Sequence, residues 1–138
     1  MEDVVLIILL IVTLMIIGRS IMMLFKHPGI KEHLMPASHL LVLAIVYGTI
    51  ICGFGLIFAL LSLMGYPVLK MEWSQFNFFT FIEACIYFSS STILSVGYGD
   101  IVPVGLGRWI ATFEALIGYL LPIAFVLTSV IQHNKMTK

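Results

Sequence analysis

Residues 95–100 place two glycines at alternating positions, in the order Ser-Val-Gly-Tyr-Gly-Asp. Glycine adopts left-handed backbone without a Cβ clash, so Gly97 and Gly99 allow the chain to alternate between the ordinary and left-handed regions. This alternation turns successive carbonyl oxygens to one side, and it turns the side chains of Val96 and Tyr98 away from them. Carbonyl oxygens from several chains can replace the water around a dehydrated potassium ion. The chemistry predicted for these residues is therefore cation coordination by the backbone.

The segment directly before these residues, 76–94, is apolar and aromatic but contains Glu83 and the hydroxyl run 89–92. These polar residues make it a poor spanning helix. Irregular backbone at membrane depth survives only inside protein or beside water, so we expect a re-entrant segment. Thr80 and Glu83 fit a capping box. The pattern predicts a short helix over residues 81–94, followed by a filter-like loop over 95–99.

The composition of the whole chain is that of a membrane protein. Of its 138 residues, 61% are hydrophobic and 10% are charged, whereas soluble domains carry roughly a quarter charged residues. Three runs are long enough to span a bilayer, and they cover residues 4–25, 40–64 and 109–131. The net charge of zero excludes a basic nucleic-acid surface. No phosphate loop, catalytic triad or metal-ligand spacing appears, so we expect neither an enzyme nor a cofactor.

Basic residues predict the orientation of these spans. Arg19, Lys26 and Lys31 lie between the first two spans, and Lys135 and Lys138 follow the third. Because positive charge concentrates on the cytoplasmic side, we expect the 19–37 linker and the C-terminus to be cytoplasmic. The N-terminus and the 65–108 segment should then face outward.

Residues 95–100, placed after a short helix and between two spans, resemble the signature of the potassium channel family, usually Thr-Val-Gly-Tyr-Gly-Asp. The resemblance covers roughly residues 38–131. It implies an all-α membrane protein with a two-helix pore module, a re-entrant pore helix and a selectivity filter, assembled as a homotetramer. One extra transmembrane helix and its linker, 1–37, precede this pore domain, 38–138. Its parts are an outer helix 38–64, a pore helix 81–94, a filter 95–99 and an inner helix 108–132.

The resemblance also assigns roles to filter residues. It implies that the backbone carbonyls of Ser95, Val96, Gly97 and Tyr98 coordinate K⁺, and that the Ser95 hydroxyl adds the innermost ring of ligands. Serine replaces the usual threonine here and lacks the methyl group that restricts its rotamer. We expect selectivity to survive and the innermost site to be looser.

Other residues are expected to support the filter. Tyr87 and Phe88 either form an aromatic cuff around it or belong to a generic aromatic core. Relatives often carry a glutamate at the position of Ser91, paired with the residue equivalent to Asp100; without it, we expect Asp100 to reach Tyr87. The full set of expected support residues is Gly99, Asp100, Tyr87, Phe88, Ser91, Thr92 and Glu114.

The third span contains the remaining candidates. Gly118 matches the family's hinge glycine or serves close packing, and Pro122 can bend the helix. The hinge and gate residues that the family register places toward the ion path are Gly118, Tyr119, Pro122, Val126 and Val130.

Glu114 is a carboxylate within a span, and such a residue is functional by default or else a buried group that packs against the pore helix. We expect Glu114 near the hydroxyl run, partly protonated at neutral pH, so that filter opening depends on pH.

Together these features predict a potassium-selective channel in the plasma membrane, in contact with lipid and with K⁺ as the permeant ion. Two alternatives remain open. A potassium transporter subunit also carries filter-like loops, although that class usually has four degenerate copies in one chain. A non-conducting membrane interaction protein would use the first span as its contact surface.

Overall fold

The structure, a computed structural model, describes residues 2–26, 36–71 and 77–136. Within these ranges the chain forms four helices and one short two-stranded sheet, in agreement with the expected all-α class. The elements in chain order are α1 (Glu2–Lys26), α2 (Pro36–Leu63), β1 (Leu69–Lys70), α3 (Phe78–Ile93), β2 (Val102–Pro103) and α4 (Leu106–Met136). Residues 27–35 of the predicted 19–37 linker lie outside the described residues.

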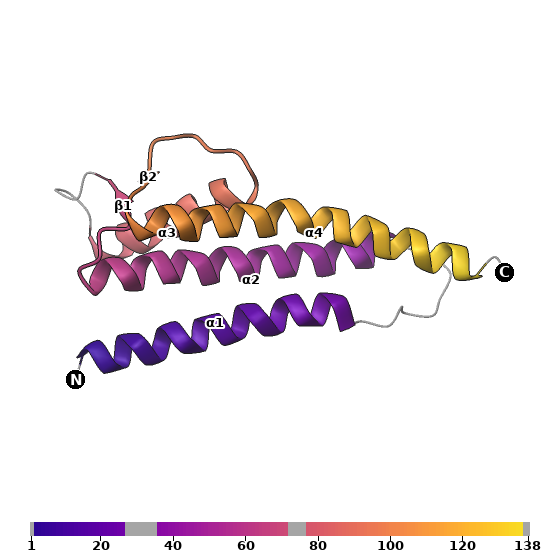
Figure 1. Cartoon of the computed structure of the whole chain (residues 1–138), viewed down its shortest axis with the longest axis horizontal. Helices are drawn as coiled ribbons and strands as arrows, with labels where there is room; N and C mark the ends of the chain where they lie inside the picture. Colours follow the sequence, from indigo (N-terminus) through magenta and orange to yellow (C-terminus); the bar gives the residue numbers. More distant parts are fainter. Residues whose placement is uncertain (1, 27–35, 72–76, 137–138) are drawn as a thin grey trace.

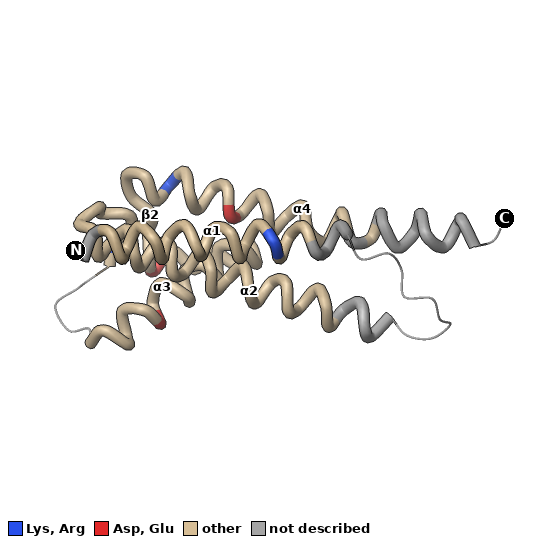
Figure 2. The backbone as a smooth tube through the Cα atoms, turned by 90° about the horizontal axis from the view of Figure 1, so that it is seen from below, with Lys and Arg blue, Asp and Glu red and all other residues tan. Residues whose placement is uncertain are grey.

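Three of the four described helices are long and apolar enough to cross a membrane, as the sequence predicted. The candidate spans are Val4–Met22, Leu41–Leu63 and Leu106–Ala124. Figure 2 shows how few charged positions interrupt these helices in the described part of the chain. The shorter α3 lacks the length to span, which agrees with the expected re-entrant segment.

The spanning helices lie side by side along the long axis, and α3 packs between α2 and α4 at one end (Figure 1). The N-terminus, β1 and β2 lie at this same end, whereas the C-terminus lies at the other. Helix α1 packs on α2, where Ile17 reaches the backbone of Gly53; a Cβ at Gly53 would lie 2.6 Å from the Ile17 side chain. The core where α2, α3 and α4 meet includes Phe58, Phe88 and Ile93.

The start of the short helix corrects one prediction from the sequence. The helix begins at Phe78 with Asn77 as its N-cap residue, not at residue 81 behind a capping box. Asn77 has extended backbone (φ −67°, ψ 157°), and its carbonyl accepts the Phe81 amide at 3.0 Å. Thr80 and Glu83 therefore lie inside the helix. The Asn77 side chain makes no capping hydrogen bond, and the two aromatic residues after it join the first turn.

A short two-stranded sheet joins the connection before α3 to the connection before α4. Strands β1 and β2 pair antiparallel, with Leu69 opposite Pro103 and Lys70 opposite Val102. The Val104 amide extends this pairing by donating to the carbonyl of residue 68 at 2.8 Å. The chain that leaves the filter-like loop is thus tied to the end of α2 before α4 begins.

Candidate functional site: the loop after α3 and its supports

The loop that follows α3 is held by the last turn of that helix. The final carbonyls of a helix have no hydrogen-bond donors within the helix. Backbone amides of this loop act as the donors. The amides of Val96 and Gly97 both donate to the Ser91 carbonyl, at 2.9 and 3.1 Å. The Ser95 amide donates to the Thr92 carbonyl at 3.0 Å. The start of the loop is therefore set by the C-terminal turn of α3.

The backbone of this loop alternates in the way that its glycines predict. Gly97 has φ +61° and Gly99 has φ +80°, so the left-handed conformation expected at both is confirmed. Ser95 has φ +57°, whereas Val96 and Tyr98 do not have positive φ. Left-handed backbone thus occurs at every second residue from 95 to 99.

The left-handed backbone of Ser95 was not predicted from the sequence. A β-branched residue with positive φ is a genuine outlier, because its second Cβ substituent crowds the backbone. Serine keeps the hydroxyl group and lacks that substituent. The departure from threonine at this position therefore matches the local backbone, in addition to loosening the side-chain rotamer.

Tyr98 turns back from the loop onto α3. Its ring stacks on that of Tyr87, with 6.0 Å between the ring centroids and 10° between the planes. The pKa of the Tyr87 hydroxyl is raised, first by partial desolvation and then by its hydrogen bond to Asp100 and the charge of that carboxylate. Asp100 therefore lies within reach of Tyr87, as expected, and its role in supporting the loop remains a prediction. Asp100 also accepts the Ile101 amide at 3.0 Å.

Tyr87 and Phe88 take different roles, one at the loop and one in the aromatic core. Tyr87 lies against the loop, as a cuff residue would. Phe88 points into the core, where it packs edge-to-face on Phe58 of α2 with ring centroids 5.0 Å apart. Phe88 therefore anchors α3 to α2, and Tyr87 contacts the loop.

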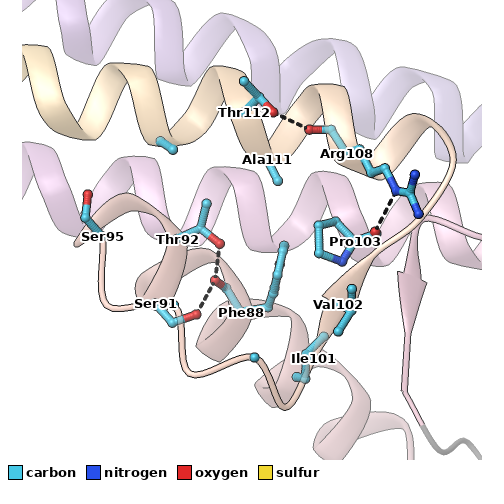
Figure 3. A pocket seen from close by; sticks show the side chains of 13 residues that line it. Phe88, Ser91, Thr92, Ser95, Ile101, Val102, Pro103, Arg108, Ala111 and Thr112 are labelled. Carbon is cyan, nitrogen blue, oxygen red and sulfur yellow. Dashed lines mark hydrogen bonds between the residues drawn. The ribbon is translucent and has the colours of Figure 1, made fainter.

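A cavity of about 660 Å³ lies between the loop, α3 and the start of α4 (Figure 3). Ser91 and Thr92 face it, but their hydroxyls donate to the Phe88 carbonyl at 2.9 and 2.8 Å. On the other side, Arg108 donates through Nε to the Pro103 carbonyl at 3.4 Å. In the single chain this cavity is open, and residues 95–100 beside it are exposed.

Glu114 of α4 is fully buried against the middle of α3. Its Oε1 is hydrogen-bonded to the Ser89 hydroxyl, and Ser89 Oγ also lies 2.9 Å from the Ile51 carbonyl of α2. Its Oε2 has no partner among the described residues. The predicted location of Glu114 beside the hydroxyl run is confirmed, although the sequence did not single out Ser89 within that run.

The single hydrogen of the Ser89 hydroxyl indicates whether the Glu114 carboxyl group carries a proton. A serine hydroxyl has one hydrogen, and the Ile51 carbonyl can only accept. Both contacts of Ser89 Oγ are hydrogen bonds only if the Glu114 carboxyl donates to it while Ser89 donates to Ile51. The geometry therefore favours a neutral Glu114 that connects α2, α3 and α4.

Gly118 lies where α4 comes closest to the end of α3. A Cβ at this position would lie 2.1 Å from the Ile93 carbonyl oxygen, so glycine is required for the contact. The close-packing role that was left open for Gly118 is therefore present. Helix α4 continues without a break through Gly118 and Pro122, and bending there remains a prediction.

The residues predicted to line a gate follow on the same helix. Tyr119, Pro122 and Val126 are exposed in the single chain, with Tyr119 at 66% and Val126 at 57%. They leave a surface of α4 that other parts of this chain do not cover. Val130 lies further along α4, and its side chain is outside the described part of the structure.

Comparison with known proteins agrees with this architecture. Residues 40–133 match the family Ion_trans_2, described as ion channel. The chain is 38% identical over 127 residues to Protein LctB of Geobacillus stearothermophilus, covering 91% of this chain and 94% of that protein. It is 38% identical over 100 residues to Protein LctB of Bacillus caldotenax, covering 71% and 75%. No solved structure matches. The chain is therefore not an enzyme, and it belongs to the ion channel family.

Proposed function

We propose that this chain is a potassium-selective channel and that four copies surround one ion path. The observation that carries the proposal is the alternating left-handed backbone at Ser95, Gly97 and Gly99. In such a loop the carbonyls of residues 95–98 face one side and replace the hydration shell of K⁺. The Ser95 hydroxyl adds the innermost ring of oxygens.

A homotetramer is proposed because one chain supplies only a fraction of the oxygens that a dehydrated ion needs. Closed rotational symmetry places identical loops around an axis. The exposed loop, the open cavity beside it and the uncovered face of α4 support this arrangement. The mass of the intact complex in mild detergent tests it, and a monomer or dimer would contradict it.

Potassium selectivity is tested with purified protein in planar bilayers that separate potassium from sodium. We expect single-channel currents whose reversal potential follows the potassium gradient and not the sodium gradient. Currents that follow both gradients equally would reject the carbonyl filter. Uptake that requires an energy source would favour a transporter subunit, and a tetramer without current would favour an interaction protein.

The filter itself is tested by Gly97→Ala, with Gly65→Ala as its matched control. Both glycines have left-handed backbone and open space where a Cβ would lie, but Gly65 lies outside the filter. Alanine costs about 1–2 kcal/mol at each such position, and the cost recurs in every chain. We expect potassium current to be lost in Gly97→Ala and kept in Gly65→Ala. Equal currents in the two variants would contradict the proposal.

We further propose that the protein spans the plasma membrane with its N-terminus outside and its C-terminus in the cytoplasm. The alternation of the spans and the basic linker between the first two support this orientation. A cysteine introduced in the 19–37 linker should react with a membrane-impermeant reagent only from the cytoplasmic side. Labelling from outside would show that the proposed orientation is wrong.

A further inference from the structure

The carbonyl of Gly118 lacks its normal partner within α4. In an α-helix each carbonyl accepts the amide four residues later, and for Gly118 that residue is Pro122. Proline has no amide hydrogen, and its ring crowds the carbonyl four residues before it. A carbonyl left unpaired at membrane depth is costly. Some other donor is therefore needed at this point of α4.

Tyr47 of α2 supplies that donor. Its hydroxyl donates to the Gly118 carbonyl at 2.7 Å, across 71 positions of sequence. Tyr47 is half-buried, and its ring reaches α4 from the neighbouring spanning helix. Freed carbonyls at proline sites are commonly paired by neighbouring helices, and here a single phenol group does so.

The same residue of α4 is held from its other side. Gly118 lies in close contact with Ile93, the last residue of α3. Only Leu94 separates Ile93 from the loop 95–99. Helix α4 is therefore held by α2 and α3 at Gly118, about one helical turn before Pro122. Beyond Pro122 lies the part of α4 that carries the predicted gate.

We propose that Tyr47 is a positioning residue for the inner helix. It replaces the amide that Pro122 lacks and stabilises the conformation in which α4 lies against α2 and α3. Any conformation in which α4 moves away from α2 at Gly118 loses this hydrogen bond. The equilibrium between conducting and closed states therefore depends on the Tyr47 hydroxyl. Only the effect of Tyr47 on gating depends on the proposed channel function; the replacement of the missing amide does not.

A double-mutant cycle tests the proposal with wild type, Tyr47→Phe, Pro122→Ala and the double variant. In Tyr47→Phe, we expect the ratio of open to closed time to shift at least about fivefold for each chain that moves, since a net hydrogen bond is worth about 1 kcal/mol. Alanine at 122 restores the amide, so Gly118 regains its partner within the helix. The same tyrosine substitution should then shift the ratio less than twofold in the Pro122→Ala background.

Tyr66→Phe serves as the matched control, because it removes the same hydroxyl from an exposed tyrosine beyond the end of α2. It should leave gating unchanged. An equal shift in both backgrounds, or an equal shift in Tyr66→Phe, would overturn the proposal.

The same four proteins are also unfolded thermally in detergent, a measurement that does not depend on whether the protein conducts ions. The two substitutions could be coupled in the free energy of unfolding but not in the ratio of open to closed time. The hydrogen bond would then have only a structural role, and the proposed effect of Tyr47 on gating would be overturned. Absence of coupling in both would overturn the replacement of the proline amide by Tyr47. If wild type carries no current, the channel proposal fails, while the unfolding cycle still tests the hydrogen bond.

Discussion

Gly118→Ala is the substitution whose effect the structure defines most sharply. The new Cβ would lie 2.1 Å from the Ile93 carbonyl oxygen, whereas ordinary contact begins at 3.4 Å. The neighbour is backbone, so it cannot turn aside as a side chain would. Helix α4 must move away from α3, and we expect this movement to weaken both the hydrogen bond from Tyr47 and the contact between Ser89 and Glu114.

The magnitude follows from two opposing effects. Overpacking costs about 1–3 kcal/mol, whereas replacing glycine by alanine inside a helix gains about 1 kcal/mol. Gly48→Ala is the matched control, because this α2 glycine has no atom within 4 Å of its Cβ position. Both variants gain the same helix propensity. The difference between them, about 1–3 kcal/mol, therefore measures the clash.

The assay is thermal unfolding in detergent, combined with bilayer recording of the same variants. Gly118→Ala should unfold at a lower temperature than wild type, and Gly48→Ala at the same temperature or a higher one. If the two variants are equally stable and Gly118→Ala conducts normally, the close contact with Ile93 does not exist. If the two are equally stable but gating is altered in Gly118→Ala, Gly118 acts as a hinge and not as a packing residue.

Four further predictions concern the residues that support the proposed filter and gate. Ser89→Ala should lower the free energy of unfolding by about 1–3 kcal/mol, because it leaves the buried Glu114 carboxyl without its described partner. Glu114→Gln should unfold as wild type does but lose any pH response of open probability between about pH 5 and 8, because glutamine cannot gain or lose the proton that we expect Glu114 to exchange in that range. Val126→Asp should increase leak through a gate that closes by dewetting, and an unchanged open probability would place the gate elsewhere. Tyr87→Phe should reduce the loss of stability that begins above the ordinary tyrosine pKa of 10.0, because the folded protein holds the Tyr87 proton more tightly than the unfolded chain does; an equal loss in wild type and variant would contradict the raised pKa of Tyr87.

Several features of the site follow from local sequence alone. Gly97 and Gly99 alternate with larger residues, and only glycine adopts left-handed backbone freely, so the conformation of these two residues could be predicted from residue types. The left-handed backbone of Ser95 could not be predicted in this way. The spans follow from apolar length in the same way. The start of α3 was placed wrongly because Asn77 and Thr80 are both good N-cap residues. Choosing between them requires the packing of the aromatic residues that follow.

Contacts between distant segments could not be predicted in this way. Pro122 indicates that the Gly118 carbonyl lacks an amide, but nothing in the sequence identifies Tyr47 as the residue that replaces it. Glu114 was a candidate from its place in a span, yet its contact with Ser89 depends on how α3 lies against α4. The pairing of β1 with β2 joins segments separated by the whole of α3 and the loop that follows it.

The sequence by itself determined that the chain is a membrane protein with three apolar spans and one glycine-containing loop suited to cation coordination. These properties depend on composition and on backbone preferences within a few residues. The tertiary structure alone decided which hydroxyl meets Glu114, which phenol meets Gly118 and which carbonyl excludes a Cβ there. Such contacts depend on the rotation and spacing of whole helices, because residues far apart in the chain meet only after the helices have packed.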